Sequence, residues 1–308
     1  MRNRIQVGAL LAALHASAAL GADLAPQRAA LQREKDPARL EMVAVAIASS
    51  GDAAALGDLA KRLGEKSFLS RLDPARDSVT DVLRLGEVFK ALAVHPSPAT
   101  AALCIEVAKD PEFRAVPVRL NLLLSALAAV RPVSAAAATL FSATGRAGFL
   151  QVNVPLLAVN ASPRALAVLA ELLADESLEA GHRVSAAQWG IMPSRLTPGV
   201  AEMCRGLLQP SKLAPQVALG ILGSLFDYRP VQWFGKRSGQ PSPPPWNQAS
   251  AATASTLVAL GTSQLRRTDL PVELRAAIAE ALGQLRRTIA AGCSLRNCLR
   301  TDSVSEIT

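Results

Sequence analysis

The chain of 308 residues has little of what β-sheet proteins and most enzymes carry. Aromatic residues make up 4% of it, tyrosine occurs once, and alternating runs of β-branched residues are absent. Histidine occurs three times, at positions 15, 95 and 182, in no recognisable triad or metal-binding motif. Leucine and alanine dominate instead, and both favour helices. The composition therefore predicts an all-α protein.

Standard catalytic motifs are also missing. The chain has no Gly-x-Ser-x-Gly, His-Glu-x-x-His or Cys-x-x-Cys-His sequence. Gly64-Glu-Lys-Ser67 resembles the end of a phosphate-binding loop, but Glu65 separates the glycine from the lysine and the segment looks helical. We expect no catalytic residue, no cofactor and no metal ion.

Residues 1–22 have the three-part layout of a secretory signal peptide. A basic start is followed by an apolar run from Ile5 to Leu14 and then by small residues. Polar residues at 15 and 17 leave this run shorter than the ~20 residues of a membrane span, which favours cleavage near Ala18–Ala22 over an uncleaved anchor. Charges interrupt every later apolar segment, so we expect no transmembrane segment after cleavage and a periplasmic or secreted protein.

Positive charge is concentrated in the last third of the chain. Lysine and arginine together number 33 against 25 acidic residues, a net charge of +8. Residues 229–300 carry ten basic and three acidic side chains, so that segment alone is +7. One interpretation is an anionic partner. The alternative is that arginines near helix ends complement the helix dipole.

The clearest pattern is a recurring step of one residue followed by proline. Asp, Ser or Thr can cap a helix, and proline suits its first turn. A start signal repeated roughly every 30 residues is typical of stacked two-helix repeats. The intervals run from 24 to 37 residues, between Asp36-Pro37, Asp73-Pro74, Ser97-Pro98, Arg131-Pro132, Ser162-Pro163 and Thr197-Pro198.

The position six residues after the proline is mostly small or apolar, as a buried helix position requires. It holds Val43, Cys104, Ala138, Leu169 and Cys204, whereas Thr80 fits less well. Cys104 and Cys204 share this register about three repeats apart, which is beyond disulfide reach. We therefore expect two buried thiols that act as small apolar residues.

Further helices are predicted at 118–130, 183–191, 214–226 and 271–285, the last with apolar residues three and four apart. Here the chain resembles a known family. The second helix of a HEAT repeat typically reads Val-Arg-x-x-Ala-Ala-x-x-Leu-Gly. The matching residues, with Glu273 and Leu274 between the valine and the arginine, are Val272, Arg275, Ala276, Ala277, Ala281, Leu282 and Gly283.

Weaker matches to the same helix begin at Val118-Arg119 and Arg183-Val184, and 165–173 fits the first helix of the repeat. The resemblance covers roughly residues 36–290. It implies an α-solenoid of stacked two-helix HEAT-like repeats, spanning 23–300 after the signal peptide. Such proteins usually bind other molecules.

Residues 229–248 interrupt the pattern of helical repeats, because five prolines and two glycines forbid a continuous helix. We expect an inserted loop there. Aromatic and basic side chains stand together in it, a combination enriched at binding hot spots. Alternatively, its tryptophans cover the edge of the solenoid. The candidate binding residues are Trp233, Phe234, Lys236, Arg237 and Trp246.

The C-terminal end carries two more cysteines. Cys293 and Cys298 are five residues apart and could close a small disulfide ring in an oxidising compartment. No histidine accompanies them, so a zinc site is not expected. Residues 301–308 are short and polar, which predicts a disordered tail.

These observations favour an exported, non-enzymatic protein-binding or assembly scaffold. Its partner would be a protein or an anionic envelope component, and not a nucleic acid. The alternative is an all-helical envelope enzyme of the hydrolase or lyase type, with carboxylates that converge in the solenoid groove. Such a site would pair Asp227 with Asp175 or Glu176.

Overall fold

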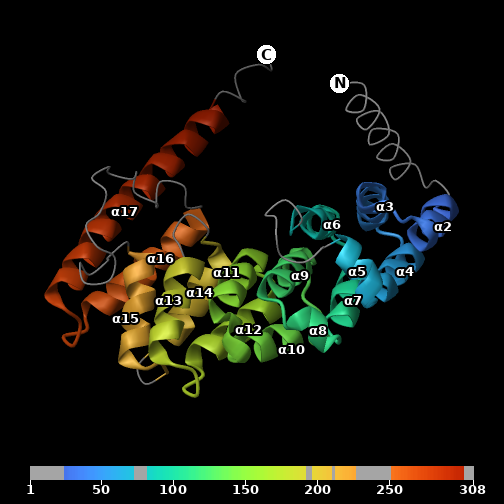
Figure 1. Cartoon of the computed structure of the whole chain (residues 1–308). Helices are drawn as coiled ribbons and strands as arrows, with labels where there is room; N and C mark the ends of the chain where they lie inside the picture. The colour runs from blue at the N-terminus through green and yellow to red at the C-terminus, as the bar shows by residue number, and fades with distance from the viewer. Residues whose placement is uncertain (1–23, 73–81, 192–195, 210–211, 227–250, 302–308) are drawn as a thin grey trace, which may run out of the picture. The chain divides into compact units, whose positions relative to one another are not determined.

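The structure is a computed structural model that describes residues 24–72, 82–191, 196–209, 212–226 and 251–301. Every regular element in these ranges is a helix, so the predicted all-α class is confirmed for the described part (Figure 1). The chain divides into two compact units, Met1–Phe141 and Ser142–Thr308. The division falls within helix α10 (Ala135–Thr144).

Unit 1 combines long helices with two short ones. Helices α3, α6 and α9 contact one another in turn, and α4 contacts α7, so the long helices form two rows. The short helix α5 contacts α3, α4 and α6, and the one-turn helix α8 contacts α9. In order, the elements before α10 are α2 (Ala25–Arg33), α3 (Pro37–Ser50), α4 (Ala53–Leu63), α5 (Lys66–Leu72), α6 (Val82–Val94), α7 (Pro98–Val107), α8 (Pro111–Arg114) and α9 (Pro117–Ala129).

Each short helix of unit 1 is anchored in the core by one phenylalanine. Phe68 of α5 and Phe113 of α8 are both 0% exposed. The ring of Phe113 meets that of Phe89 on α6 in a tilted pair, with 6.0 Å between centroids. Burying a phenylalanine contributes about 1.5–3 kcal/mol, enough to hold a helix too short to form on its own.

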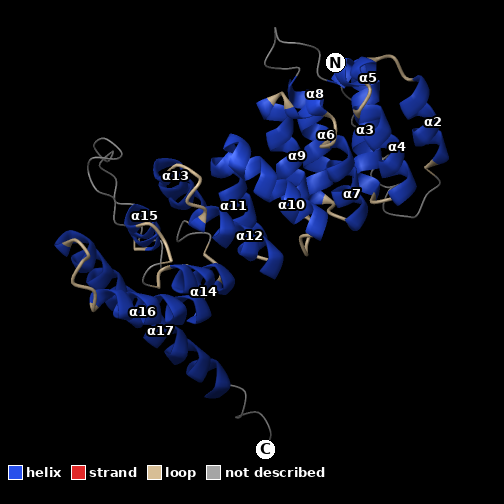
Figure 2. Ribbon diagram, turned by 90° about the horizontal axis from the view of Figure 1, so that it is seen from below, coloured by secondary structure: helices blue, strands red, loops and turns tan. Residues whose placement is uncertain are grey.

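Unit 2 also has two rows, and its helices alternate between them. Helices α11, α13 and α15 contact one another in turn, as do α12, α14 and α16, and α17 packs on α16. Figure 2 shows the first of these rows side by side. After α10 come η1 (Gly145–Phe149), α11 (Leu150–Asn160), α12 (Pro163–Ala174), α13 (Ala180–Gly190), α14 (Pro198–Leu207), α15 (Pro215–Leu225), α16 (Ala251–Leu265) and α17 (Val272–Thr301).

Glycines bring the helices of this first row close together. A Cβ atom added at Gly190 of α13 would lie 2.5 Å from Cγ1 of Val154 on α11, and 3.0 Å from the backbone nitrogen of Pro155. At Gly220 of α15, it would lie 3.0 Å from Cγ1 of Val184 on α13. Real Cβ atoms essentially never come as close as 2.5 Å, so a side chain at Gly190 would require its neighbours to shift, whereas at Gly220 the Val184 side chain would have to give by a few tenths of an ångström.

Most of the predicted helix starts are confirmed. Proline occupies the first helical position of α3, α7, α12 and α14. Asp36, Ser97 and Thr197 cap three of these helices by accepting a backbone N–H bond, at 2.9, 3.1 and 3.2 Å. Pro74 lies outside the described residues. The four long helices predicted at 118–130, 183–191, 214–226 and 271–285 correspond to α9, α13, α15 and α17.

The start predicted at Pro132 is wrong. Helix α10 begins three residues later, at Ala135, because Ser134 supplies the cap. The Ser134 hydroxyl accepts a bond of 3.2 Å from the Ala137 N–H. The register is shifted accordingly, and Ala138 is partly exposed.

The predicted buried register holds for three helices and fails for two. Cys104, Leu169 and Cys204 are all 0% exposed, in α7, α12 and α14. Val43 is partly exposed, as Ala138 is. In α3 the buried face is formed by Leu40, Ala44, Ile47 and Ala48, so Val43 lies beside it. Helix α3 also packs with α6, whereas α7 packs with α4 in the other row of unit 1. The step at Pro37 therefore begins a helix that is not equivalent to α7.

Candidate functional site

A groove in unit 1 is lined by residues from the short helices and the turns beside them. Helix α4 ends at Leu63, and the N–H of Gly64 closes it with a bond of 3.2 Å to the carbonyl of Ala60. Helix α5 begins at Lys66, which leaves only a two-residue turn. Gly64 has ordinary helical backbone angles, φ −76° and ψ −9°, so its contribution is the absence of a side chain beside the groove.

The other wall comes from the start of α8 and the first turn of α9. The Asp110 carboxylate accepts a bond of 2.9 Å from the N–H of Glu112 and so caps α8. Pro117 begins α9 and places Arg119 in its first turn. Proline fixes the backbone at both helix starts, which positions the charged residues that follow.

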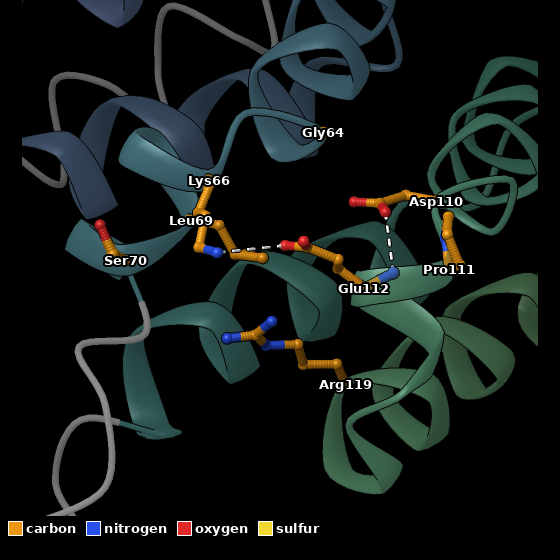
Figure 3. A pocket seen from close by; sticks show the side chains of 8 residues that line it. All are labelled: Gly64, Lys66, Leu69, Ser70, Asp110, Pro111, Glu112 and Arg119. Atoms are coloured by element: carbon orange, nitrogen blue, oxygen red, sulfur yellow. Dashed lines mark hydrogen bonds and ion pairs between the residues drawn. The ribbon is translucent and has the colours of Figure 1, made fainter.

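The groove encloses about 600 Å³. Lys66 and Glu112 face each other across it, with 3.7 Å between Nζ and Oε2. Figure 3 shows the ammonium of Lys66 and the guanidinium of Arg119 toward one side, the carboxylate of Asp110 toward the other, and the carboxylate of Glu112 between them, directed at Lys66. The lining residues are Gly64, Lys66, Leu69, Ser70, Asp110, Pro111, Glu112 and Arg119.

Beside the groove, the turn between α4 and α5 is held by an arginine. Arg62 lies over the ring of Phe68, with 4.9 Å from Cζ to the centroid, and its guanidinium also pairs with Glu65. A cation over an aromatic face contributes about 0.5–2 kcal/mol, depending on its exposure. The turn follows a helix and not a strand, so it lacks the strand–loop–helix context of a phosphate-binding loop.

The chemistry of the groove is suited to binding. Its eight lining residues include two cations and two carboxylates but neither cysteine nor histidine. Leu69 is buried and gives the floor an apolar surface. The arrangement can offer charges of both signs, and an apolar contact between them, to a small polar ligand.

The predicted binding residues are not part of this groove. Trp233, Phe234, Lys236, Arg237 and Trp246 all lie within 227–250, outside the described residues. Phe226, just before that segment, is 1% exposed and belongs to the core of unit 2. The predicted hot spot in the inserted loop therefore stays a prediction.

Burial of the first two cysteines is confirmed. Cys104 and Cys204 are free thiols at 0% exposure, and burial raises the pKa of each to about 12. Cys293 and Cys298 lie on α17, at a part of it whose side chains are outside the described ones. In a regular helix, Cα atoms five residues apart are separated by about 8–9 Å, more than a disulfide spans, so their bond would need the helix to open. That disulfide stays a prediction.

Asp175, one of the carboxylates considered for an enzyme, is held in a polar network of unit 2. It accepts a bond of 2.6 Å from the Ser177 hydroxyl and pairs with Arg146 Nε at 2.8 Å. The Ser177 hydroxyl and then Arg146 lower its pKa to about 2. Arg146 also pairs with Glu171. A carboxylate so firmly ionised suits an ion pair and not proton donation. Asp227 lies outside the described residues.

Other polar positions give no site. Asn160, the acceptor of the sequon Asn160-Ala-Ser162, is only 2% exposed, and its Oδ1 accepts from the Ser162 N–H at 3.2 Å. Its amide is therefore out of reach of a glycosylating enzyme in the folded chain. In the ranges that the structure covers, no cluster of His, Cys, Asp and Glu could hold a metal ion. No described helix has the length and apolar character needed to cross a membrane.

Comparison with known proteins gives no match: no protein-family model, curated protein or solved structure corresponds to the chain. The groove itself is not predicted by any motif, because its lining residues come from three segments. One signal was nevertheless present in the sequence. Asp110-Pro111 is the same kind of capping step as Asp36-Pro37, and it marks the start of α8.

Proposed function

We propose that the chain is an exported α-solenoid of HEAT-like two-helix repeats that acts as a non-enzymatic binding scaffold. The observation that carries this proposal is the stacking in unit 2. Successive helices from α11 to α16 alternate between the two rows, as the helices of two-helix repeats do when they extend a solenoid. Solenoids present long helical faces, and those faces usually bind partners.

The segment at Arg183 supports the resemblance to HEAT repeats. Arg183 is 3% exposed, and its Nη1 donates a bond of 3.1 Å to the carbonyl of Leu173, near the end of α12. A cation at the C-terminus of the preceding helix is favourable because of the helix dipole. On the same helix, Val184 and Gly190 make the close contacts with α15 and α11. One short sequence thus joins α13 to α12 before it and to α11 and α15 in its own row.

The contact surface that we propose is the inserted loop at 229–248, which stands in sequence between α15 and α16. Its partner would be a protein or an anionic envelope component, since aromatic and basic residues occur together there. Export rests on the signal-peptide layout of residues 1–22. N-terminal sequencing of the protein isolated from its native cells tests that part, and a mature chain that starts near residues 19–23 is the expected result.

Partner capture tests the binding role. The tagged chain and a Trp233→Ala/Phe234→Ala variant are used to capture proteins from native envelope extracts, with quantification by mass spectrometry. Hot-spot residues contribute about 2 kcal/mol or more, so the variant should capture at least about tenfold less of a specific partner. Trp189→Ala is the matched control, because Trp189 is an exposed tryptophan of α13 outside the loop.

Two results would contradict the proposal in different ways. Equal capture by the loop variant and the wild type would remove the loop as the contact surface. In the reciprocal experiment, each captured protein is tagged in turn and tested for capture of the chain. If none of them captures it, the scaffold role is overturned. Both variants are first required to melt as the wild type does, so that loss of capture is not loss of folding.

A further inference from the structure

We propose that the C-terminal part of helix α17, residues 286–301, binds an anionic lipid surface. The inference goes beyond the proposed scaffold role and concerns a different segment of the chain from the inserted loop. Its basis is one juxtaposition. Helix α17 continues past the helix on which it packs, and the part that continues has arginines on one face, apolar residues on another and no acidic residue.

Helix α17 is twice as long as its neighbour α16. It has 30 residues against 15, which corresponds to about 45 Å against about 22 Å. The short connection between the two makes them antiparallel neighbours, and Gly261 sets their register. A Cβ atom added at Gly261 would lie 2.8 Å from Leu282 Cδ2 and 3.2 Å from Ile278 Cγ2. The start of α16 at Ala251 therefore lies beside roughly residue 290. Figures 1 and 2 both show α17 continuing beyond that point.

The face of α17 that packs on α16 does not continue as an apolar face. Its buried residues are Leu274, Ile278, Ala281, Leu282 and Leu285. Eighteen residues make about five turns of helix, so the register of Ile278 and Leu282 recurs at Arg296 and Arg300. Burial of unpaired arginines is costly. The last turns of α17 are therefore not suited to extend the apolar contact with a further repeat.

Positive charge in this segment is unopposed in the sequence. Residues 281–301 hold four arginines and no acidic residue. Arginines at a helix end can complement the helix dipole, but that effect falls off within the last turn. Arg286 and Arg287 lie several turns before the end of α17, so the dipole does not account for them. The charge instead matches an anionic surface outside the protein.

The same segment has an apolar face of its own. Its four members are spaced as one side of a helix requires, at Ala291, Leu295, Cys298 and Leu299. The arginines at 286, 296 and 300 occupy another side of the same helix. Such a helix binds at the surface of an anionic bilayer, where its apolar side enters the headgroup layer and its cations meet lipid phosphates. A soluble polyanion would use the arginines alone, so the two faces together favour a lipid surface.

The experiment is cosedimentation of the purified full chain with lipid vesicles. One set of vesicles contains phosphatidylcholine alone, and the other contains three parts of it to one part of phosphatidylglycerol. A reducing agent keeps Cys293 and Cys298 as thiols. The chain should bind the anionic vesicles at least about tenfold more tightly than the neutral ones. This preference should shrink as salt is raised, because the Debye length falls from about 10 Å at 0.1 M to about 3 Å at 1 M.

A first pair of variants tests the basic face. Arg296→Gln/Arg300→Gln should bind the anionic vesicles about 25-fold more weakly, since each arginine near such a surface contributes about 1 kcal/mol, or about fivefold. Glutamine has a helix propensity close to that of arginine, so α17 should keep its helix. Arg164→Gln/Arg266→Gln is the matched control. It removes the same charge from two exposed residues of unit 2 outside α17, and it should bind nearly as the wild type does.

A second pair tests the apolar face. Leu295→Gln/Leu299→Gln keeps the charge and should bind the anionic vesicles at least about tenfold more weakly, because two leucines no longer enter the headgroup layer. Val272→Gln is its control, since Val272 is 66% exposed at the other end of the same helix. Binding to a DNA duplex is measured in parallel. Loss of the leucines should leave that binding unchanged, because a polyanion contacts the arginines alone.

Several outcomes would overturn the inference. Equal binding to neutral and anionic vesicles is one, and an Arg164→Gln/Arg266→Gln variant as weak as the α17 arginine variant is another. If the leucine variant bound vesicles as tightly as the wild type, the surface would be one for polyanions and not for lipid. Every protein compared carries the same residues 1–23, so that segment does not contribute to the differences. The Trp233→Ala/Phe234→Ala variant should keep vesicle binding, so this proposal and the loop proposal can each fail without the other.

Discussion

Replacement of Gly190 by alanine should destabilise unit 2, and the contact with α11 gives the reason. The added Cβ atom would lie 2.5 Å from Cγ1 of Val154, 3.0 Å from the Val154 carbonyl carbon and 3.0 Å from the nitrogen of Pro155. Two of these three atoms belong to the backbone, so rotation of a side chain cannot relieve the clash. Helices α11 and α13 must move apart.

The loss in free energy of unfolding caused by Gly190→Ala can be bounded. Inserting one methyl group into a tightly packed core typically costs about 1–3 kcal/mol. Alanine gains up to about 1 kcal/mol over glycine in a helix, but Gly190 is the last residue of α13, where this gain is small. A net loss of about 1–3 kcal/mol lowers the melting temperature by roughly 2–12 °C in a protein of this size.

Gly206 supplies the control within the same unit. It lies in α14, and a Cβ atom added there has no heavy atom within 4 Å beyond its own helix turn. Gly206→Ala should therefore be neutral or stabilising by up to about 1 kcal/mol. Urea titration followed by far-ultraviolet circular dichroism compares the two variants with the wild type.

A double variant separates the clash from other effects of the substitution. Val154→Ala removes the nearest methyl group and is destabilising alone, because Val154 is fully buried. Combined with Gly190→Ala, it should cost less than the sum of the two single losses, by about 0.5 kcal/mol or more. If Gly190→Ala were as stable as the wild type, or if the two losses were simply additive, the close approach of α11 and α13 would be refuted.

Two further predictions concern ionisable groups. With the two C-terminal cysteines replaced by serine, Cys104 and Cys204 should resist a thiol reagent at pH 8 until the protein unfolds, because burial raises the pKa of each to about 12; labelling of the native protein would contradict this. The pKa of Asp175 falls from 3.8 to about 2 on folding, through the Ser177 hydroxyl and Arg146, so its stabilising effect is complete above pH ~4 and is lost as pH falls toward 2. Urea titrations across that range should show a flatter pH dependence for Asp175→Asn, and an unchanged slope would count against the network.

Local signals in the sequence predicted the helices well, because each depends on neighbouring residues only. The capping steps before Pro98 and Pro198 begin helices, and the position six residues later is buried in both. Where a proline step did not begin the helix as predicted, a competing local interaction set the position at which the helix begins. At Pro132 the nearby Ser134 provides the cap, and α10 starts later than the proline predicts.

Assignment of a helix to a row was beyond the sequence, because it depends on contacts between helices. The step at Pro37 looks like the step at Pro98, yet α3 packs with α6 whereas α7 packs with α4. The groove was hidden for the same reason. Lys66 and Glu112 stand 46 positions apart, and nothing in either local sequence indicates that they meet.

The short helices explain why this groove forms in unit 1. In the first row of unit 2, each helix contacts the next directly, with no room for a side chain at Gly190 and little at Gly220. In unit 1, α5 follows α4 and α8 follows α7 before the next long helix begins, and each is fixed in the core by a phenylalanine. Helix α8 buries Phe113, and α5 buries Phe68, Leu69 and Leu72, while the charged residues of both helices are not buried. Their charged residues are therefore held in place by the core yet remain accessible, which is the combination that a small binding site requires.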